Sequence, residues 1–256
     1  MAGRRRYSEL ICTALLFLLM GANVCSSEVK ISRIDDKGRF ATIQLTDRIT
    51  PADATSFTQV TALLRPNFDV VEVELDSAGG DVFAAMQIGT IIRKDWLWTA
   101  VPDEPPAKGC LSACVLVLAA GAVRIIGSDS LIGIHRPFFE QRFFASLNQS
   151  QAKEKYDTLS QSVAVYLAKM GISDRLYYEM MKVPSSSIRF LSYNEAAELD
   201  LSGGDPAYSE WTRAKNVVKY GEAKMKEFDD WLTREKEYMT YCTGSINRFD
   251  EQLWLR

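Results

Sequence analysis

The chain has 256 residues, of which 47% are hydrophobic, a content that suits a protein with a substantial core and excludes an intrinsically disordered chain. Its formal net charge is −3, and beyond residue 26 it contains no block of basic residues. This balance argues against nucleic acid as a partner. The length allows one large α/β domain or two small ones.

The first residues have the organisation of an export signal. Three arginines at positions 4–6 precede an apolar run over residues 10–20, and small and polar residues follow up to Ser27. The apolar run is too short to span a bilayer. We therefore expect residues 1–26 to be cleaved and the mature protein to be exported to the periplasm or another extracytoplasmic space. An uncleaved membrane anchor is the less favoured alternative.

Strands and helices alternate after this segment. Residues 39–46 alternate between apolar and polar side chains and predict a half-buried strand, and the runs 70–75 and 96–101 predict two more. A proline at the first helical position predicts a helix over 51–64, and a helix over 82–94 follows a pair of glycines. The inner face of the first helix should consist of Phe57, Val60, Leu63 and Leu64. Strand, turn and helix in this order are typical of a parallel sheet.

A turn of small residues precedes a short buried helix. The sequence Lys-Gly-Cys-Leu-Ser-Ala-Cys at 108–114 leads into apolar residues, and we expect Ser112 in the turn that opens a helix ending near Gly121. Free backbone N–H groups and the positive end of the helix dipole favour a developing oxyanion at such a turn. Ser112 is therefore a candidate nucleophile.

The sequence contains a single histidine, His135. Two short strands are predicted over 124–126 and 130–135, which places His135 at the end of a strand, close to a proline that stops further pairing. Any Ser–His chemistry in this chain has only this side chain as a general base. Ser112 and His135 thus form the one candidate pair.

The last part of the chain is predicted to be mainly helical. Helices are expected over 149–170 and 174–181, a short strand over 188–191, and a helix that opens with the capping box at 192–195. Beyond Pro206 we expect one amphipathic helix that is docked on the body or on a partner. Its apolar face is marked by Trp211, Ala214, Val218, Met225, Phe228 and Leu232.

Four motifs, in this order, resemble those of the Clp-type serine peptidases of the Clp/crotonase superfamily. The family's Asn-Ser-Pro-Gly-Gly turn is matched by Asp-Ser-Ala-Gly-Gly at 76–80, and its Ala-Ser-Met-Gly turn by Leu-Ser-Ala-Cys at 111–114. Its Met-Ile-His-Gln-Pro run is matched by Gly-Ile-His-Arg-Pro at 133–137. A later Arg-Phe-Leu-Ser-x-x-Glu-Ala run is present at 189–196.

The resemblance implies a fold and an activity. The fold would be α/β, a Clp/crotonase-like spiral of βαβ units over 27–205, with 206–256 as a C-terminal helical appendage. The protein would be a serine-type peptidase without a cofactor, and the helix over 149–170 would make contacts in a homo-oligomer. An export signal separates the chain from any ATP-driven unfoldase of the cytoplasm. The expected substrates are therefore peptides or already unfolded segments of proteins.

The resemblance also implies the roles of the site residues. Ser112 would be the nucleophile and His135 the general base, while the backbone N–H groups of Gly80 and Ala113 would form the oxyanion hole. One position departs from the family, because the residue that should be the triad aspartate is Ile188. An isoleucine can neither orient an imidazole nor stabilise its charge.

We therefore expect a Ser–His dyad, with the second ring nitrogen of His135 held by another group. The hydroxyl of Ser187 is the first candidate, ahead of Asp174 and Asp200. A catalytically inactive binding or scaffold module is the alternative that Ile188 favours. Acyl-CoA chemistry of the crotonase branch is a further alternative, which an exported compartment without CoA disfavours.

Three cysteines remain after cleavage of the export signal, namely Cys110, Cys114 and Cys242. With one histidine and no Cys-x-x-Cys motif, they do not predict a metal site. Two cysteines four apart on one helix have Cβ atoms about 5–6 Å apart, farther than the ~3.5–4.5 Å of a disulfide. A bond between Cys110 and Cys114 therefore requires Cys110 to precede the helix, where it would fix the nucleophile turn. The alternative is a pair of buried apolar thiols.

An aromatic cluster directly follows the histidine and comprises Phe138, Phe139, Phe143 and Phe144. These side chains are interpreted as the lining of a groove for an extended peptide, as an oligomer contact, or as core packing. The sequence does not decide among the three.

Overall fold

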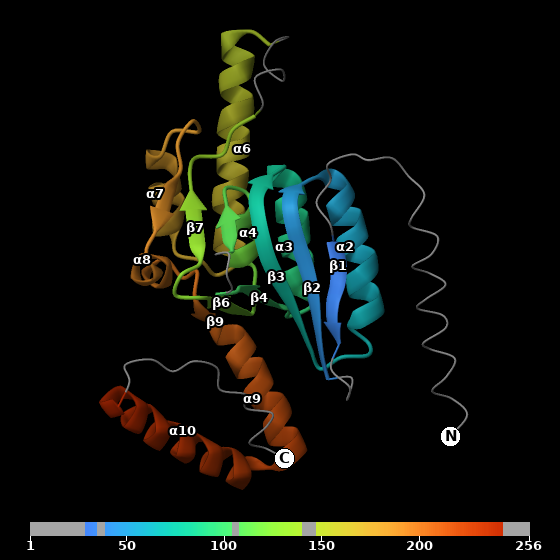
Figure 1. Cartoon of the computed structure of the whole chain (residues 1–256), viewed down its shortest axis with the longest axis vertical. Helices are drawn as coiled ribbons and strands as arrows, with labels where there is room; N and C mark the ends of the chain where they lie inside the picture. The colour runs from blue at the N-terminus through green and yellow to red at the C-terminus, as the bar shows by residue number, and fades with distance from the viewer. Residues whose placement is uncertain (1–28, 35–38, 104–107, 140–146, 243–256) are drawn as a thin grey trace, which may run out of the picture.

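A computed structural model of the chain describes residues 29–34, 39–103, 108–139 and 147–242, with side chains described up to residue 234. The predicted export signal lies outside the described residues, as do Phe143 and Phe144. The described part is an α/β protein built around one mixed sheet (Figure 1). None of its helices combines the length and the apolar character that crossing a membrane requires.

Nine strands of the described residues form the sheet. They are β1 (Val29–Ile34), β2 (Phe40–Ile49), β3 (Val70–Gly80), β4 (Trp98–Val101), β5 (Gly109–Leu111), β6 (Val123–Ile126), β7 (Leu131–Ile134), β8 (Arg189–Leu191) and β9 (Gly203–Gly204). The strands from β2 to β7 pair in parallel, whereas β1, β8 and β9 are antiparallel additions. The sequence predicted the parallel strands apart from β5, and it predicted neither β1 nor β9.

The sheet divides at β3, which has two successive partners on one edge. Its first half pairs with β4, and Ser77, farther along the strand, pairs with Cys110 of β5. On its other edge β3 pairs with β2 as far as the pair of Ile49 and Gly80. The carboxyl end of β3 therefore lies beside the turn that follows β5.

Two crossover helices confirm the sequence prediction at both ends. These are α2 (Pro51–Leu64) and α3 (Val82–Lys94). Thr50 forms a capping box with Asp53 at the start of α2, and Asp81 accepts a hydrogen bond from the N–H of Ala84 at the start of α3. Both caps satisfy N–H groups that have no partner within the helix.

The prediction that Leu63 faces the core is wrong, because this side chain is 50% exposed. The buried stripe of α2 steps instead through Ala54, Phe57, Thr61 and Leu64 at spacings of three and four residues. The next helix, α4 (Cys114–Ala119), is buried at all of its residues and is shorter than expected. It lies against α3 at the centre of the core.

The helices that follow confirm the predicted order. They are α6 (Gln149–Lys169), α7 (Asp174–Lys182) and α8 (Tyr193–Glu198), and Ser192 caps α8 together with Glu195. The buried residues of α6 begin at Leu159, so its N-terminal half extends beyond the body (Figure 1).

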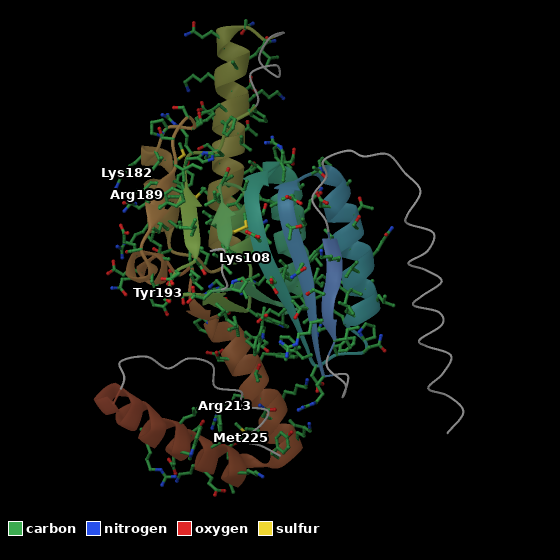
Figure 2. The ribbon with its side chains drawn as sticks, viewed as in Figure 1. Lys108, Lys182, Arg189, Tyr193, Arg213 and Met225 are labelled. Atoms are coloured by element: carbon green, nitrogen blue, oxygen red, sulfur yellow. A yellow bond between two sulfur atoms is a disulfide. The ribbon has the colours of Figure 1, made fainter. Side chains whose placement is uncertain are left out.

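The prediction of one long helix beyond Pro206 is wrong. Gly221, with a φ of 87°, ends α9 (Pro206–Tyr220), and α10 (Glu222–Cys242) continues in another direction (Figure 1). Met225 is buried between the two helices (Figure 2), and Arg213 of α9 pairs with Asp229 of α10 at 2.6 Å. Val218, which was expected on the apolar face, is 89% exposed.

Asp205 joins α9 to the body of the protein. Its carboxylate pairs with Arg93 of α3 and also accepts a hydrogen bond from the N–H of Ala207 at 2.8 Å. Burial alone would raise the pKa of Asp205, but the hydrogen bond and charge of Arg93, with the N–H groups of α9, lower it overall. The carboxylate therefore stabilises the folded state in its charged form.

We expect Asp205→Asn to lower the free energy of unfolding by about 2 kcal/mol near neutral pH. Because the pKa of Asp205 is lower in the folded state, its stabilisation is complete above its unfolded pKa of about 4 and is lost as the pH falls further. Urea denaturation at pH 7 and pH 3 measures both values. The exposed ion pair of Asp157 with Lys153 provides the control, since Asp157→Asn should lower the free energy of unfolding by less than about 0.5 kcal/mol. An Asp205 effect that is as large at pH 3 as at pH 7 would contradict this assignment.

Candidate active site

Ser112 and His135 line the same two cavities, at the carboxyl ends of β3, β5 and β7. The first cavity has a volume of about 610 Å³ and is mostly apolar; its walls include Val82, Phe83, Leu116, Leu159, Val163 and Met180. The second has a volume of about 270 Å³. Gly80 also lines both cavities, and Ala113 lines the first. The structure thus brings the four sequence-predicted site residues together.

Ser112 occupies a sharp turn between β5 and α4. Its φ of 57° lies in the left-handed region, which costs a residue with a side chain about 1–2 kcal/mol. The turn is held by the N–H of Ser112, which donates to the carbonyl oxygen of Gly133 at 2.8 Å, and by the N–H of Val115, which donates to the carbonyl of Ser112 at 3.1 Å. A strained strand-to-helix turn of this kind presents a nucleophile to solvent.

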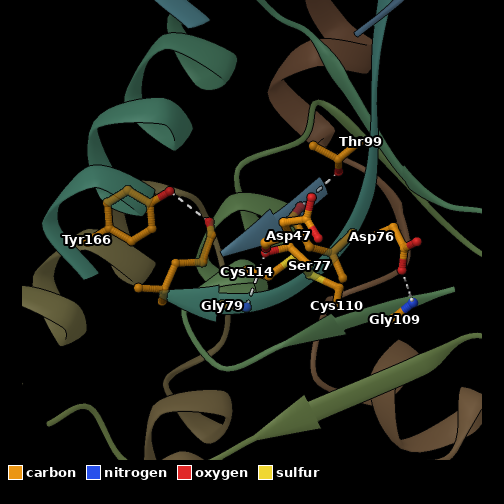
Figure 3. Close-up of a disulfide and its surroundings, with 11 residues drawn as sticks. Asp47, Asp76, Ser77, Gly79, Thr99, Gly109, Cys110, Cys114 and Tyr166 are labelled. Carbon is orange, nitrogen blue, oxygen red and sulfur yellow. Dashed lines mark hydrogen bonds between the residues drawn. A yellow bond between two sulfur atoms is a disulfide. The ribbon is translucent and has the colours of Figure 1, made fainter. Parts of the chain in front are cut away.

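A disulfide between Cys110 and Cys114 brackets this turn (Figure 3). Their Cα atoms are 5.2 Å apart, because Cys110 belongs to β5 and only Cys114 belongs to α4. The carboxylate of Asp76 holds the start of β5, where it accepts hydrogen bonds from the N–H of Gly109 and from Lys108 Nζ, each at 3.1 Å. The interpretation of the two cysteines as free thiols is therefore wrong, and the candidate nucleophile lies within a closed loop of five residues.

We expect the double substitution Cys110→Ala and Cys114→Ala to lower the free energy of unfolding by about 2 kcal/mol, the loop entropy of a bridge this short. Guanidinium denaturation of both proteins measures the difference. Dithiothreitol should destabilise the wild-type protein and leave the double variant unchanged. An equal effect of dithiothreitol on both would show that the bond contributes nothing to stability.

Gly79 packs directly against the Ser112 turn. It has a φ of 90°, and a Cβ atom at this position would lie 2.6 Å from the carbonyl oxygen of Leu111 and 2.7 Å from Cβ of Ser112. Its N–H donates to the hydroxyl of Ser77 at 3.1 Å, and that hydroxyl donates to the carbonyl oxygen of Asp47 (Figure 3). Glycine is therefore required here by both the backbone angle and the close approach.

Gly80 and Ala113, whose N–H groups the sequence assigned to the oxyanion hole, line the first cavity together with Ser112. The N–H of Asp81 donates to Ile49 of β2 at 2.9 Å. Gly80 therefore lies at the end of β3, where the strand is still paired with β2. Ala113 directly precedes α4, where N–H groups have no partner within the helix.

His135 follows the last residue of β7 and is only 6% exposed. Its Nδ1 lies 2.8 Å from the carbonyl oxygen of Arg136. A carbonyl oxygen can only accept, so Nδ1 is the donor in this contact, and in the neutral ring Nε2 is then the nitrogen with a free lone pair. The N–H of Arg136 donates to the carbonyl oxygen of Val183 at 3.0 Å, which anchors this segment to the end of α7. The backbone thereby selects the tautomer that a general base requires.

The sequence assigned this orienting role to Ser187, or to Asp174 or Asp200, and the structure corrects that expectation. Among the described residues, no hydrogen bond joins any of the three to His135. The carboxylate of Asp200 accepts a hydrogen bond from the N–H of Ser173 at 3.0 Å instead. Ile188 lines the second cavity and is 43% exposed. A backbone carbonyl leaves no signature in the sequence, so no motif could have identified Arg136.

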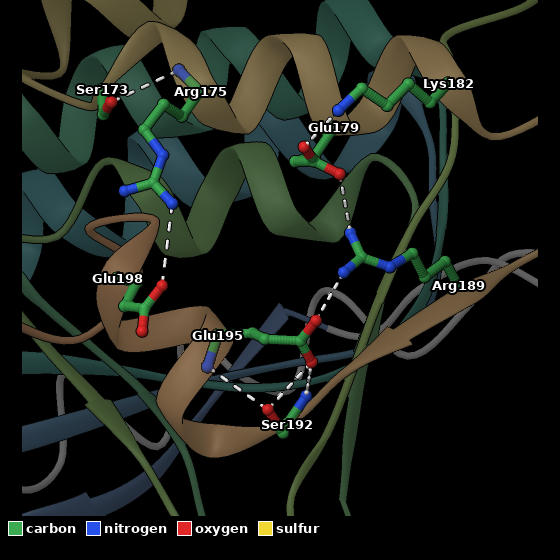
Figure 4. A network of polar contacts seen from close by, with 8 residues as sticks. All are labelled: Ser173, Arg175, Glu179, Lys182, Arg189, Ser192, Glu195 and Glu198. Carbon is green, nitrogen blue, oxygen red and sulfur yellow. Dashed lines mark hydrogen bonds and ion pairs between the residues drawn. The ribbon is translucent and has the colours of Figure 1, made fainter.

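A polar network holds the elements beside the site. Arg189 of β8 pairs with Glu179 of α7 at 3.0 Å and with Glu195 of α8 at 2.5 Å (Figure 4). A hydrogen bond from Lys182 and nearby cations lower the pKa of Glu179, and hydrogen bonds from Ser192 with the charge of Arg189 lower that of Glu195. Both carboxylates therefore stay charged at neutral pH. The pair of Glu179 with Arg189 ties α7 to β8, the two elements that flank the loop lining the second cavity.

The described residues contain no group of three or more His, Cys, Asp or Glu side chains that could hold a metal ion. A search against models of protein families found no match to the chain, and a search of curated proteins found no similar sequence. The function must therefore be argued from the geometry of the site.

Proposed function

We propose that the protein is a serine-type peptidase in which Ser112 and His135 act as a catalytic dyad. The observation that carries the proposal is the hydrogen bond from Nδ1 of His135 to the carbonyl oxygen of Arg136. It leaves Nε2 as a base in the cavities that Ser112 also lines. A nucleophile and a base that share a cavity, together with a strained turn at the nucleophile, support nucleophilic catalysis.

In the proposed reaction Nε2 of His135 accepts the proton of the Ser112 hydroxyl as its oxygen attacks the scissile carbonyl carbon. The N–H groups of Gly80 and Ala113 stabilise the oxyanion of the tetrahedral intermediate. His135 then gives the proton to the leaving amine, which leaves an acyl group on Ser112. Water, deprotonated by the same nitrogen, releases the acid and restores the serine.

The Arg136 carbonyl would replace part of what a triad aspartate does. It fixes the tautomer and the orientation of the ring, and its dipole stabilises the imidazolium that forms. It carries no full negative charge, so the stabilisation is weaker than a carboxylate would provide. We therefore expect a rate below that of a full triad.

The mostly apolar first cavity suits an apolar side chain of a peptide. Phe138 and Phe139 both line it, which supports their interpretation as groove residues. The parallel βα units and the order of the motifs support a Clp/crotonase-like spiral. The extended N-terminal half of α6 is available for contacts in a homo-oligomer, and export to an extracytoplasmic space would exclude an ATP-driven partner.

The alternative is an inactive binding module with the same fold. Ile188 favours it, because this apolar side chain stands where the triad would have its aspartate. Such a protein would bind peptides in the same cavities without activating Ser112.

Labelling of the purified protein with a fluorophosphonate probe separates the two functions, because the probe reacts only with an activated serine. We expect the wild-type protein to be labelled at Ser112 and the variant Ser112→Ala to remain unlabelled. Ser128→Ala, an exposed serine that donates to Asp103, is the matched control and should label like the wild-type protein. Absence of labelling in the wild-type protein would favour the binding module.

A further inference from the structure

The two cavities beside Ser112 differ in chemistry. The second shares Arg48, Gly80, Ser112, His135 and Phe138 with the first, but its remaining wall is formed by Ala78, Ser185, Ser186, Ser187 and Ile188. Three consecutive serines thus stand where the first cavity has large apolar side chains. A hydroxyl can donate one hydrogen bond and accept two, so this wall offers three adjacent polar side chains, whereas the first cavity is mostly apolar.

The serine loop is held in place by its backbone. The N–H of Ser187 donates to the carbonyl oxygen of Pro184 at 3.0 Å, and Val183 accepts from the N–H of Arg136 at 3.0 Å. The loop is therefore tied to the segment that carries His135. All three serines are exposed, and among the described residues none of their hydroxyl groups has a hydrogen-bond partner. These hydroxyls are positioned next to the candidate nucleophile and are available to a ligand.

The oxyanion donors indicate which side of a substrate enters which cavity. The residue that carries the scissile carbonyl must lie closest to both donors, and only the first cavity is lined by Gly80 and Ala113 together. The leaving side of the peptide then extends into the second cavity. His135 lines both cavities. This position is needed if His135 accepts the proton of Ser112 and then donates it to the leaving amine in the second cavity.

We propose that the second cavity is a polar subsite for the residue directly after the scissile bond, and that it selects small side chains that form hydrogen bonds. This inference rests on the proposed peptidase function. A volume of about 270 Å³ admits one small residue. A threonine would hydrogen-bond to the serine wall, whereas the isosteric valine offers the hydroxyls no partner.

A pair of quenched fluorescent peptides tests the subsite. Both carry leucine before the scissile bond, and threonine or valine follows it. We expect kcat/KM to be about tenfold higher for the threonine peptide, the effect of one to two hydrogen bonds. In the variant Ser185→Ala, Ser186→Ala, Ser187→Ala the two peptides should be cleaved at equal rates. The rate of fluorophosphonate labelling should stay unchanged in this variant, because the probe requires only the dyad and the oxyanion hole.

The outcomes distinguish the subsite from the function. Wild-type protein that is labelled and cleaves both peptides equally, or a triple variant that keeps the preference for threonine, would overturn the subsite alone. Labelling at Ser112 without cleavage of either peptide would overturn both the subsite and the peptidase assignment. Absence of labelling would overturn the dyad on which both depend.

Discussion

Replacement of His135 with glutamine is expected to lower the rate of fluorophosphonate labelling at Ser112 by about 10²–10⁴-fold. Glutamine has a similar size and can still donate to the Arg136 carbonyl, but it has no nitrogen that accepts a proton near neutral pH. The hydroxyl of Ser112 then keeps its proton during attack. The second-order rate constant of labelling measures this loss without requiring a known substrate.

The labelling rate of His135→Gln must be compared with the stability of this variant. The His135 ring of the wild-type protein is buried, and its centroid lies 5.6 Å from that of the Phe138 ring, so its replacement could also affect packing. We expect the thermal midpoint to change little and the labelling rate to fall. Ser128→Ala serves again as the variant that should match the wild-type protein in both measurements. A labelling rate that stays within twofold of wild type would exclude His135 as the general base.

The starts of α2 and α3 could be predicted to the residue, because the sequence marks both of them. Thr50 with Pro51 marks the start of α2, and Asp81 marks that of α3. The strand β5 could not be predicted, because it has only three residues. An alternation of apolar and polar side chains cannot be recognised in so short a segment. Its existence depends on pairing with β3 and β7, which are distant in sequence. The end of α9 at Gly221 was not predicted either. Apolar residues continue at helical spacing on both sides of Gly221, so the sequence pattern does not reveal that one helix ends and another begins there.

In the candidate site, the contributions of side chains could be predicted from the sequence, whereas those of the backbone could not. Ser112, His135 and the glycines were found because their residue types and order carry information. The partner of His135 was not found, because any residue at position 136 would supply the same carbonyl oxygen. Because Ile188 stands where the resembling family has its aspartate, the sequence favoured other polar side chains such as Ser187 as the partner of His135. An imidazole can be oriented without a carboxylate when a backbone carbonyl oxygen accepts a hydrogen bond from the ring, as that of Arg136 does here.

Gly79→Ala is expected to lower the free energy of unfolding by about 3 kcal/mol and to reduce labelling at Ser112 by at least tenfold. The left-handed backbone accounts for about 1–2 kcal/mol. The remainder is overpacking, because a methyl group would lie 2.6 Å from the carbonyl oxygen of Leu111, an atom of the turn that holds the nucleophile. The strain can be relieved only by moving that turn or the glycine, and either motion displaces Ser112 relative to Gly80, the proposed oxyanion donor on β3.

Gly221→Ala is the matched control for this experiment. Its φ of 87° is close to the 90° of Gly79, but a Cβ atom at Gly221 would have nothing within 4 Å. It should therefore cost only the backbone part, about 1–2 kcal/mol, and leave labelling unchanged. Urea denaturation and the labelling rate, measured on both variants, separate backbone strain from contact with the Ser112 turn. Equal losses of stability and equal labelling rates in the two variants would contradict this prediction. The close packing of Gly79 against the turn would then have no part in positioning Ser112.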